Sequence, residues 1–433
     1  MKRIILITAL FILGHSSLGL AGGLVRGLEV VLQEHPDLLS AQEEFFSTQE
    51  RSKAKFRDSW LPNVDVSYSY GVQHYNPADG VATDETPQKF SVKLRQLVTD
   101  FGESNSEIAA DSFSVQQKKA RLEVVRDRLL MDGLGVFVQV QKARKLIAYS
   151  EQSVQNIFKQ TKMENMLVEK GRGYSSNVLQ AKTQLAGAQA RYNRANADLD
   201  IAMSGVDAIY KQAAEFLNFD QKLSIPDSLL PTTLEDAIHI ALVENPSVKV
   251  GTFRSKTLAE KIHYEKARGF YPNLFVMGEM SRDHDLDGTL GTKRDDRFML
   301  ELSYPLNLGL SGLKYSKAAK KDLHASEQAE KSVLREIERS VRVAWRNIRT
   351  VKENSILLQN KVNIAAEFLR LAKEERKAGR RTLLEVLAAE TTLVNSQSEL
   401  AAAEADSLIF AYSLIYSMGR LDLEVVSKTV EID

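Results

Sequence analysis

The chain has 433 residues, of which 43% are hydrophobic and 26% are charged, and these values are typical of a folded protein. Lys and Arg number 57, as do Asp and Glu, so the net charge is zero and nothing favours nucleic acid or an anionic membrane surface as the main partner. The chain contains no Cys, which excludes disulfides, thiolate metal sites and a lipid-modified N-terminal Cys.

The N-terminus has the pattern of a secretory signal peptide. Lys2 and Arg3 precede an apolar run from Ile4 to Leu13, and small residues follow as far as a plausible cleavage site after Ala21. The alternative, a membrane anchor, is disfavoured because about 10 apolar residues are too few to span a bilayer. No later stretch has 18 consecutive apolar residues, so any entry of this exported protein into a membrane must use strands.

The mature chain is a tandem repeat. Pro36 and Asn63 recur as Pro246 and Asn273, and further matched pairs have the same separation of 210 positions. We therefore expect one structural unit of about 200 residues, present twice. The predicted plan is a signal peptide (1–21), repeat 1 (22–217), a linker (218–231), repeat 2 (232–421) and a C-terminal tail (422–433).

Each repeat begins with two helices that break at a proline, Pro36 in one and Pro246 in the other. Strict alternation then predicts a β-hairpin over about 63–98. A second hairpin is expected over about 273–305, where the first strand is apolar on both faces and an Asp- and Gly-rich loop runs from Asp283 to Asp296. Long segments without proline predict helical hairpins over about 103–217 and 311–418.

The long hairpins turn at Gly171 and Gly379, since glycine supplies the positive φ that ends a helix. A helix from about residue 104 to 169 would be roughly 100 Å long at 1.5 Å per residue. One globular core cannot cover such a helix. It must lie in a coiled coil or a helical barrel.

Four strands cannot close a membrane barrel alone, since small barrels need about eight. If the strands enter a membrane, several chains must pool them, with the Val and Tyr face toward lipid and the charged face toward a wet lumen. Trp60, Tyr271 and Tyr304 lie near strand ends, where interfacial aromatics are expected. The alternative is a soluble sheet packed on helices, since alternation suits that equally well.

The doubled helix-break-hairpin unit, the strand exit Thr99-Asp100-Phe101-Gly102 and the block from Gly379 to Leu387 closely resemble the TolC-like outer membrane efflux proteins, or outer membrane factors. The resemblance covers essentially the whole mature chain. It implies an α+β fold of mostly long α-helices, in which a homotrimer forms an α-helical barrel continuous with a shared 12-stranded transmembrane β-barrel, four strands from each chain.

The resemblance further implies a location in the outer membrane, extending into the periplasm, and the role of exit duct in a tripartite efflux pump or a type I secretion system. The implied partners are outer membrane lipid, a periplasmic adaptor (membrane fusion) protein and an inner-membrane transporter. Neither a cofactor nor nucleic acid is implied. The rival hypothesis is a periplasmic coiled-coil adaptor or structural protein with a small soluble sheet.

Carried over by position, Arg381 matches the family's gate arginine and Glu385 its first pore-ring acid. Ala388 and Arg376 depart from the family pattern of a second acid and an aromatic gate partner, and Glu390 is a candidate substitute for the missing acid. The alternative for Glu385 is a solvated helix-face charge. Adaptor contacts are expected at the turns, where the alternative is simple turn chemistry; these residues are Gly171, Arg172, Gly173, Gly379, Arg380 and Thr382.

No catalytic motif is visible, so an enzyme is not expected. Asp283, Asp285, Asp287 and Gly288 resemble the start of a calcium loop, but Arg294 replaces the Glu required at the twelfth position. We therefore expect an acidic extracellular loop without a metal site. The sequence leaves the transported substrate open.

Overall fold

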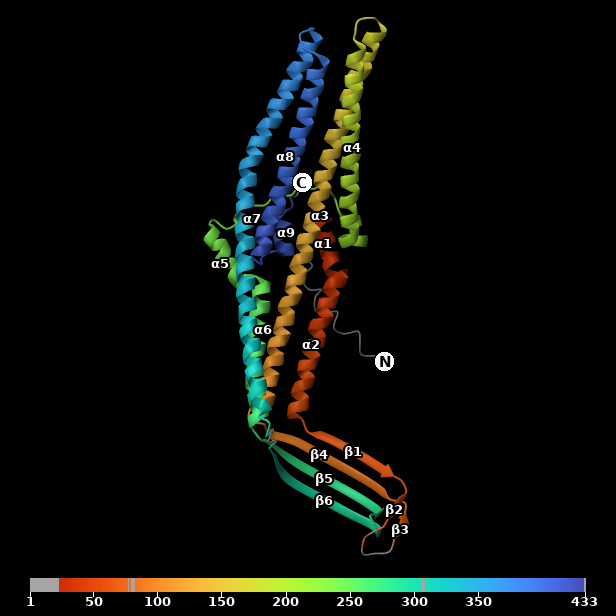
Figure 1. Cartoon of the computed structure of the whole chain (residues 1–433), viewed down its shortest axis with the longest axis vertical. Helices are drawn as coiled ribbons and strands as arrows, with labels where there is room; N and C mark the ends of the chain where they lie inside the picture. The colour runs from red at the N-terminus through yellow and green to blue at the C-terminus, as the bar shows by residue number, and fades with distance from the viewer. Residues whose placement is uncertain (1–22, 77, 79–81, 305–307, 432–433) are drawn as a thin grey trace. The chain divides into compact units, whose positions relative to one another are not determined.

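The computed structural model describes residues 23–76, 78, 82–304 and 308–431 (Figure 1). By its internal contacts the chain divides into two compact units. Of the described residues, unit 1 contains those up to Leu39, Glu123–Pro246 and those from Leu334, and unit 2 contains those of Ser40–Leu122 and Ser247–Val333. Each unit thus takes residues from both sequence repeats. The expected signal peptide, residues 1–21, lies outside the described residues.

Unit 2 contains an antiparallel sheet with the strand order β1, β4, β5, β6. The bounds of these strands are β1 (Asn63–Tyr70), β4 (Gln88–Thr99), β5 (Asn273–Leu286) and β6 (Thr289–Ser303). A short separate pair consists of β2 (Gln73–Tyr75) and β3 (Thr83–Glu85). The two repeats meet where β4 pairs with β5. Within the described chain, β1 and β6 each have one edge without a paired strand.

The prediction of a loop from Asp283 to Asp296 is wrong. Strand β5 continues to Leu286 and β6 begins at Thr289, so only Asp287 and Gly288 form the turn, both with positive φ. An Asp-Gly pair of this kind makes the tight hairpin turn that matches strand twist. The polar residues were misread because a strand needs apolar alternation only where one of its faces is buried.

The calcium-loop candidates lie in this hairpin and serve its geometry. The Asp285 carboxylate accepts a hydrogen bond from the Gly291 N–H at 2.7 Å, and that of Asp287 accepts one from the Gln73 amide at 2.8 Å. In the described part of the chain, no three acidic or His side chains gather as a metal site would require.

The proline breaks separate consecutive helices in both repeats. Helix α1 (Gly23–Glu34) ends just before α2 (Pro36–Trp60), and α5 (Leu234–Glu244) ends just before α6 (Pro246–Phe270). Proline fits the first turn of a helix, where its missing N–H leaves no hydrogen bond unmade. The breaks therefore follow directly from the local sequence.

Two pairs of long helices form the helical hairpins. The first pair is α3 (Glu103–Glu169) with α4 (Ser175–Tyr210), and the second is α7 (Ser311–Lys377) with α8 (Leu383–Ser417). Near the turns their apolar residues form two small cores in unit 1: Ile157, Ala181, Ala188, Leu383 and Leu387 in one, and Leu369, Ala372, Val386 and Ala389 in the other. No helix in the described residues is long and apolar enough to cross a bilayer.

The linker and the C-terminal tail pair with each other in unit 1. The linker follows the 3-10 helix η1 (Lys211–Phe216) and contains a second short one, η2 (Asp227–Leu229). The tail forms α9 (Leu423–Thr429), after which Val430 bridges to Leu223 as in an antiparallel sheet. The linker is thus tied to the chain end by backbone pairing.

Candidate functional site

The turn between α3 and α4 is closed by backbone hydrogen bonds. Gly171 has a φ of +71°, and its N–H bonds to the Val168 carbonyl at 2.9 Å, while the Arg172 N–H bonds to the Leu167 carbonyl at 2.8 Å. This pair of bonds is a Schellman motif, which satisfies the last carbonyls of α3. Gly173 completes the turn, and a Cβ there would lie 3.0 Å from a Val168 methyl.

The turn between α7 and α8 has the same backbone geometry. Gly379 has a φ of +74°, and its N–H and that of Arg380 bond to carbonyls of Arg376 and Glu375, each at 2.9 Å. The side chains of Arg172 and Arg380 are exposed and form no ion pair with any described residue. Both turns therefore present a free arginine at the end of a hairpin.

The start of α8 is a capping box, and it brings two predicted site residues together. Thr382 accepts a hydrogen bond from the Glu385 N–H, while the Glu385 carboxylate accepts bonds from the Thr382 N–H at 2.9 Å and hydroxyl at 2.8 Å. Reciprocal bonds of this kind satisfy orphan donors at the helix start. These bonds, first from the backbone N–H and then from the hydroxyl, lower the pKa of Glu385 below its usual value.

Arg381 is held within its own chain. Its Nε lies 2.7 Å from a carboxylate oxygen of Glu375, and its guanidinium lies 5.0 Å from the centroid of the Phe368 ring. Both contacts are to α7, so Arg381 ties the turn back to the helix that precedes it. The side chain remains 24% exposed and can still be reached by another chain.

Sequence reasoning missed a buried ion pair that joins the two hairpins. Glu164 of α3 is only 3% exposed, and Arg376 of α7 reaches it at 2.5 Å. The Asn177 amide of α4 donates to the other carboxylate oxygen at 3.0 Å. The signal was present, because Glu164 follows Ile157 by one heptad and therefore shares its buried face.

A second buried carboxylate lies deeper in unit 1. Glu390 of α8 accepts a hydrogen bond from the Asn156 amide of α3 at 2.6 Å, and the Lys373 ammonium of α7 lies 3.0 Å from its other oxygen. Its side chain is 5% exposed. The sequence left open whether Glu390 replaces the missing pore acid. It cannot, because its charge is already buried and paired.

The sheet of unit 2 has two chemically different faces. One face carries charged pairs, with Lys93 lying 3.3 Å from Glu279 and Arg95 lying 3.4 Å from Glu301. The other face is apolar and, in this chain, largely exposed. Its most exposed residues are Val64, Val66, Tyr68, Tyr70, Phe298, Leu300 and Leu302. An exposed apolar face of this extent indicates contact with another apolar phase.

The predicted interfacial aromatics lie at one end of this sheet. Trp60 precedes β1, Tyr271 precedes β5 and Tyr304 follows β6, so antiparallel pairing brings all three to the same end. The ring of Phe101, which follows β4, lies 6.4 Å from that of Tyr271. Tyr271 and Tyr304 are 38% and 50% exposed.

Comparison with known proteins agrees with this geometry. A family model described as outer membrane efflux protein matches residues 27–209 and again residues 237–420, one match in each repeat. The outer membrane efflux protein BepC of Brucella suis is 23% identical over 393 residues, covering 88% of this chain and 82% of that protein. The outer membrane protein TolC of Escherichia coli is 22% identical over 451 residues, covering 98% and 87%.

Solved structures show the same fold. The crystal structure of the Campylobacter jejuni CmeC outer membrane channel matches with a TM-score of 0.82 at 15% identity, covering 95% of this chain and 90% of that one. The fold class predicted from the sequence is confirmed: a mostly helical tandem repeat with the chain fold of trimeric outer membrane channels. The matches do not favour the rival adaptor hypothesis. With a family match in each repeat, the chain belongs to the outer membrane efflux protein family, whose members are outer membrane channels that extend into the periplasm.

Proposed function

We propose that this channel is the exit duct of a tripartite efflux pump, in which three chains enclose one tunnel and conduct substrates passively from the periplasm to the outside. The observation that carries the proposal is the sheet, which has one apolar exposed face, one charged face and two open edges. Each unpaired backbone group costs several kcal/mol in hydrocarbon, so β1 and β6 need strand partners from other chains. Three copies would supply twelve strands, enough to close a barrel with a wet interior.

The periplasmic gate is proposed at the helical turns. Arg381 and Glu385 lie in the turn and first helical turn of the second hairpin, and the ion pair of Arg376 with Glu164 ties that hairpin to the first. Opening the tip requires the two hairpins to separate. The buried pair therefore favours the closed arrangement, because separating it exposes two charges that are now paired.

Glu385 is proposed to form a ring of three carboxylates at the constriction. The side chain is exposed, and its lowered pKa keeps the carboxylate ionised at neutral pH. Like charges around a narrow water-filled pore attract cations and repel anions. The capping bonds to Thr382 use one carboxylate oxygen, so the charge is positioned by the helix start itself.

The turns are proposed to contact a periplasmic adaptor, which couples the duct to an inner-membrane transporter. Support comes from the free arginines Arg172 and Arg380 and from the exposed Thr382. Gly171, Gly173 and Gly379 shape these turns. The same duct would serve a type I secretion system, because the inner-membrane partner selects the substrate in either assembly.

The first test is the mass of the detergent-purified mature protein, with bound detergent subtracted, followed by conductance in planar lipid bilayers. We expect three chains per particle and discrete conductance steps. A particle that remains a monomer without detergent would refute the shared barrel. A trimer without conductance steps in either orientation, even with the gate variants described below, would refute the duct.

A further inference from the structure

One exposed face of α7 carries a stripe of arginines in unit 1. The stripe consists of five arginines spaced alternately four and three residues apart. This spacing places them on one side of the helix, opposite the buried residues Val341 and Ala344. All five are exposed. We call this set the arginine stripe: Arg335, Arg339, Arg342, Arg346 and Arg349.

The stripe is strongly basic in a chain whose net charge is zero. Residues 335–349 contain five arginines and two carboxylates. Among the described residues, Arg339, Arg342 and Arg349 pair only with carboxylates of their own helix, at exposed sites where such pairs contribute little. Arg335 and Arg346 have no ion-pair partner among the described residues. Exposed pairs of this kind only weakly offset the repulsion between the arginines, so an acidic surface of another chain would stabilise the stripe.

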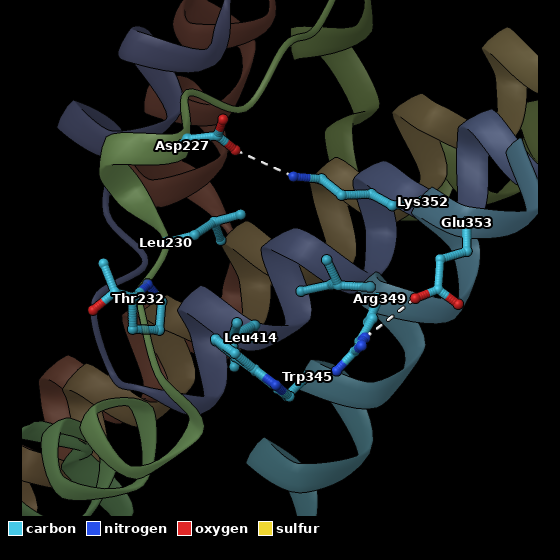
Figure 2. Close-up of a pocket in the computed structure, with 10 residues that line it drawn as sticks. Asp227, Leu230, Thr232, Trp345, Arg349, Lys352, Glu353 and Leu414 are labelled. Atoms are coloured by element: carbon cyan, nitrogen blue, oxygen red, sulfur yellow. Dashed lines mark hydrogen bonds and ion pairs between the residues drawn. The ribbon is translucent and has the colours of Figure 1, made fainter. Parts of the chain in front are cut away.

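The same face of α7 becomes apolar toward the turn. Leu357, Ile364 and Leu371 follow one another at intervals of seven residues and are 65%, 71% and 42% exposed. Exposed apolar residues at this spacing indicate a helix face that packs against another helix. The adjacent face of α7 is occupied by the linker, since the Lys352 ammonium points to the Asp227 carboxylate at 3.2 Å (Figure 2). The stripe therefore belongs to a seam that this chain leaves uncovered.

The opposite side of unit 1 has the complementary charge. Figure 1 shows α4 and α7 on opposite sides of this unit, with α8 and α3 between them. Residues 195–216, in α4 and η1, contain four carboxylates and one lysine. Asp200, Asp207 and Glu215 are exposed, and none has an ion-pair partner among the described residues.

The acidic residues and the arginine stripe lie at the same position along the long axis of the helices. Three contacts between neighbouring helices fix the positions along this axis: Lys145 with Glu404, Lys361 with Glu399, and Asn177 with Glu164. Counting along the helices from these contacts places Asp207 level with Arg346, to within about one turn of 5.4 Å. Asp200 then lies level with Arg349 and Lys352 to a similar margin.

We propose that the arginine stripe of one chain docks against Asp200, Asp207 and Glu215 of a second copy, and that this charged seam closes the helical part of the trimer. The inference rests on the trimeric duct proposed above. Two different edges that fit each other make a head-to-tail contact, and repeated rotation of such a contact closes a ring. The sheet fits the same head-to-tail arrangement, because its two open edges, β1 and β6, are different strands.

The test uses cross-linking of the full chain, which has no natural Cys. The variant Arg346→Cys with Asp207→Cys is treated with a short bismaleimide, because an ion pair spans more than the Cα separation of a disulfide, about 5.5–6 Å. We expect covalent dimers and trimers on a denaturing gel. The control, Lys352→Cys with Asp207→Cys, should give at least tenfold less, because Lys352 faces the linker.

A charge exchange gives the second readout. Arg342→Glu with Arg346→Glu should lower the trimer fraction at least tenfold at low salt, and adding Asp200→Lys with Asp207→Lys should restore it. A trimer that shows no cross-link in the Arg346→Cys, Asp207→Cys variant and also withstands the charge reversal would overturn the seam. If that trimer conducts, the seam alone is overturned and the duct stands. A cross-linked trimer that never conducts overturns the duct alone.

Discussion

Replacing Arg376 with Ala should favour the open state of the channel at its periplasmic tip. In Arg376→Ala, the Glu164 carboxylate stays buried, and among the described residues only the Asn177 amide still donates a side-chain hydrogen bond to it. Breaking a buried ion pair costs about 3–5 kcal/mol, which we reduce to about 2–3 kcal/mol because Arg376 is 23% exposed and the amide bond survives. If only the closed state loses this energy, the ratio of open to closed channels rises roughly 30- to 150-fold.

The assay is single-channel recording in planar bilayers, with thermal unfolding measured alongside. Arg376→Ala should raise the open probability or conductance, and Arg376→Lys should retain part of the closure because it keeps the charge. Arg370→Ala is the matched control, since Arg370 lies on the same helix but pairs with Glu367 at an exposed site. Conductance equal to that of the unmodified protein, with a normal melting curve, would refute the role of the buried pair in closure.

Further expected outcomes concern four residues. Arg381→Ser should raise conductance by removing the proposed gate contact with another chain, but less than Arg376→Ala does, since the pair of Arg381 with Glu375 lies within one hairpin and is partly exposed; bilayer recording checks this. Glu385→Gln should weaken cation selectivity, measured as a smaller reversal potential in a salt gradient. Because the pKa of Glu385 is lowered, the unmodified channel should keep its selectivity at pH 5. It should lose the selectivity only when the pH falls below the ordinary pKa of a Glu side chain, about 4.3. Val66→Asp should reduce the amount of trimer recovered from outer membranes, because it places a charge on the apolar sheet face. Gly419→Ala should lower the melting temperature, since Gly419 has a φ of +74° and an added Cβ would lie 2.5 Å from the backbone of Asn245.

Much of the fold follows from local chemistry. Proline at positions 36 and 246 breaks the helices wherever the rest of the chain lies, and the glycines at 171 and 379 end the long helices by their positive φ. The repeat, the long helical hairpins and the apolar strand face could therefore be predicted from patterns within single segments. Family membership and outer membrane location were predicted as well and are confirmed. The roles of Arg381 and Glu385 stay predictions.

Contacts between segments could not be predicted in this way. Glu164 and Arg376 are 212 positions apart, and Asn156 and Glu390 are 234 apart, so no periodicity connects them. Periodicity shows which face of a helix is buried but not which residue of another helix lies against it. The amino-acid sequence by itself determined the elements, their lengths and their faces. Only the tertiary structure decided which charges are buried and paired and which remain for a second chain, because burial depends on every helix packed around a residue.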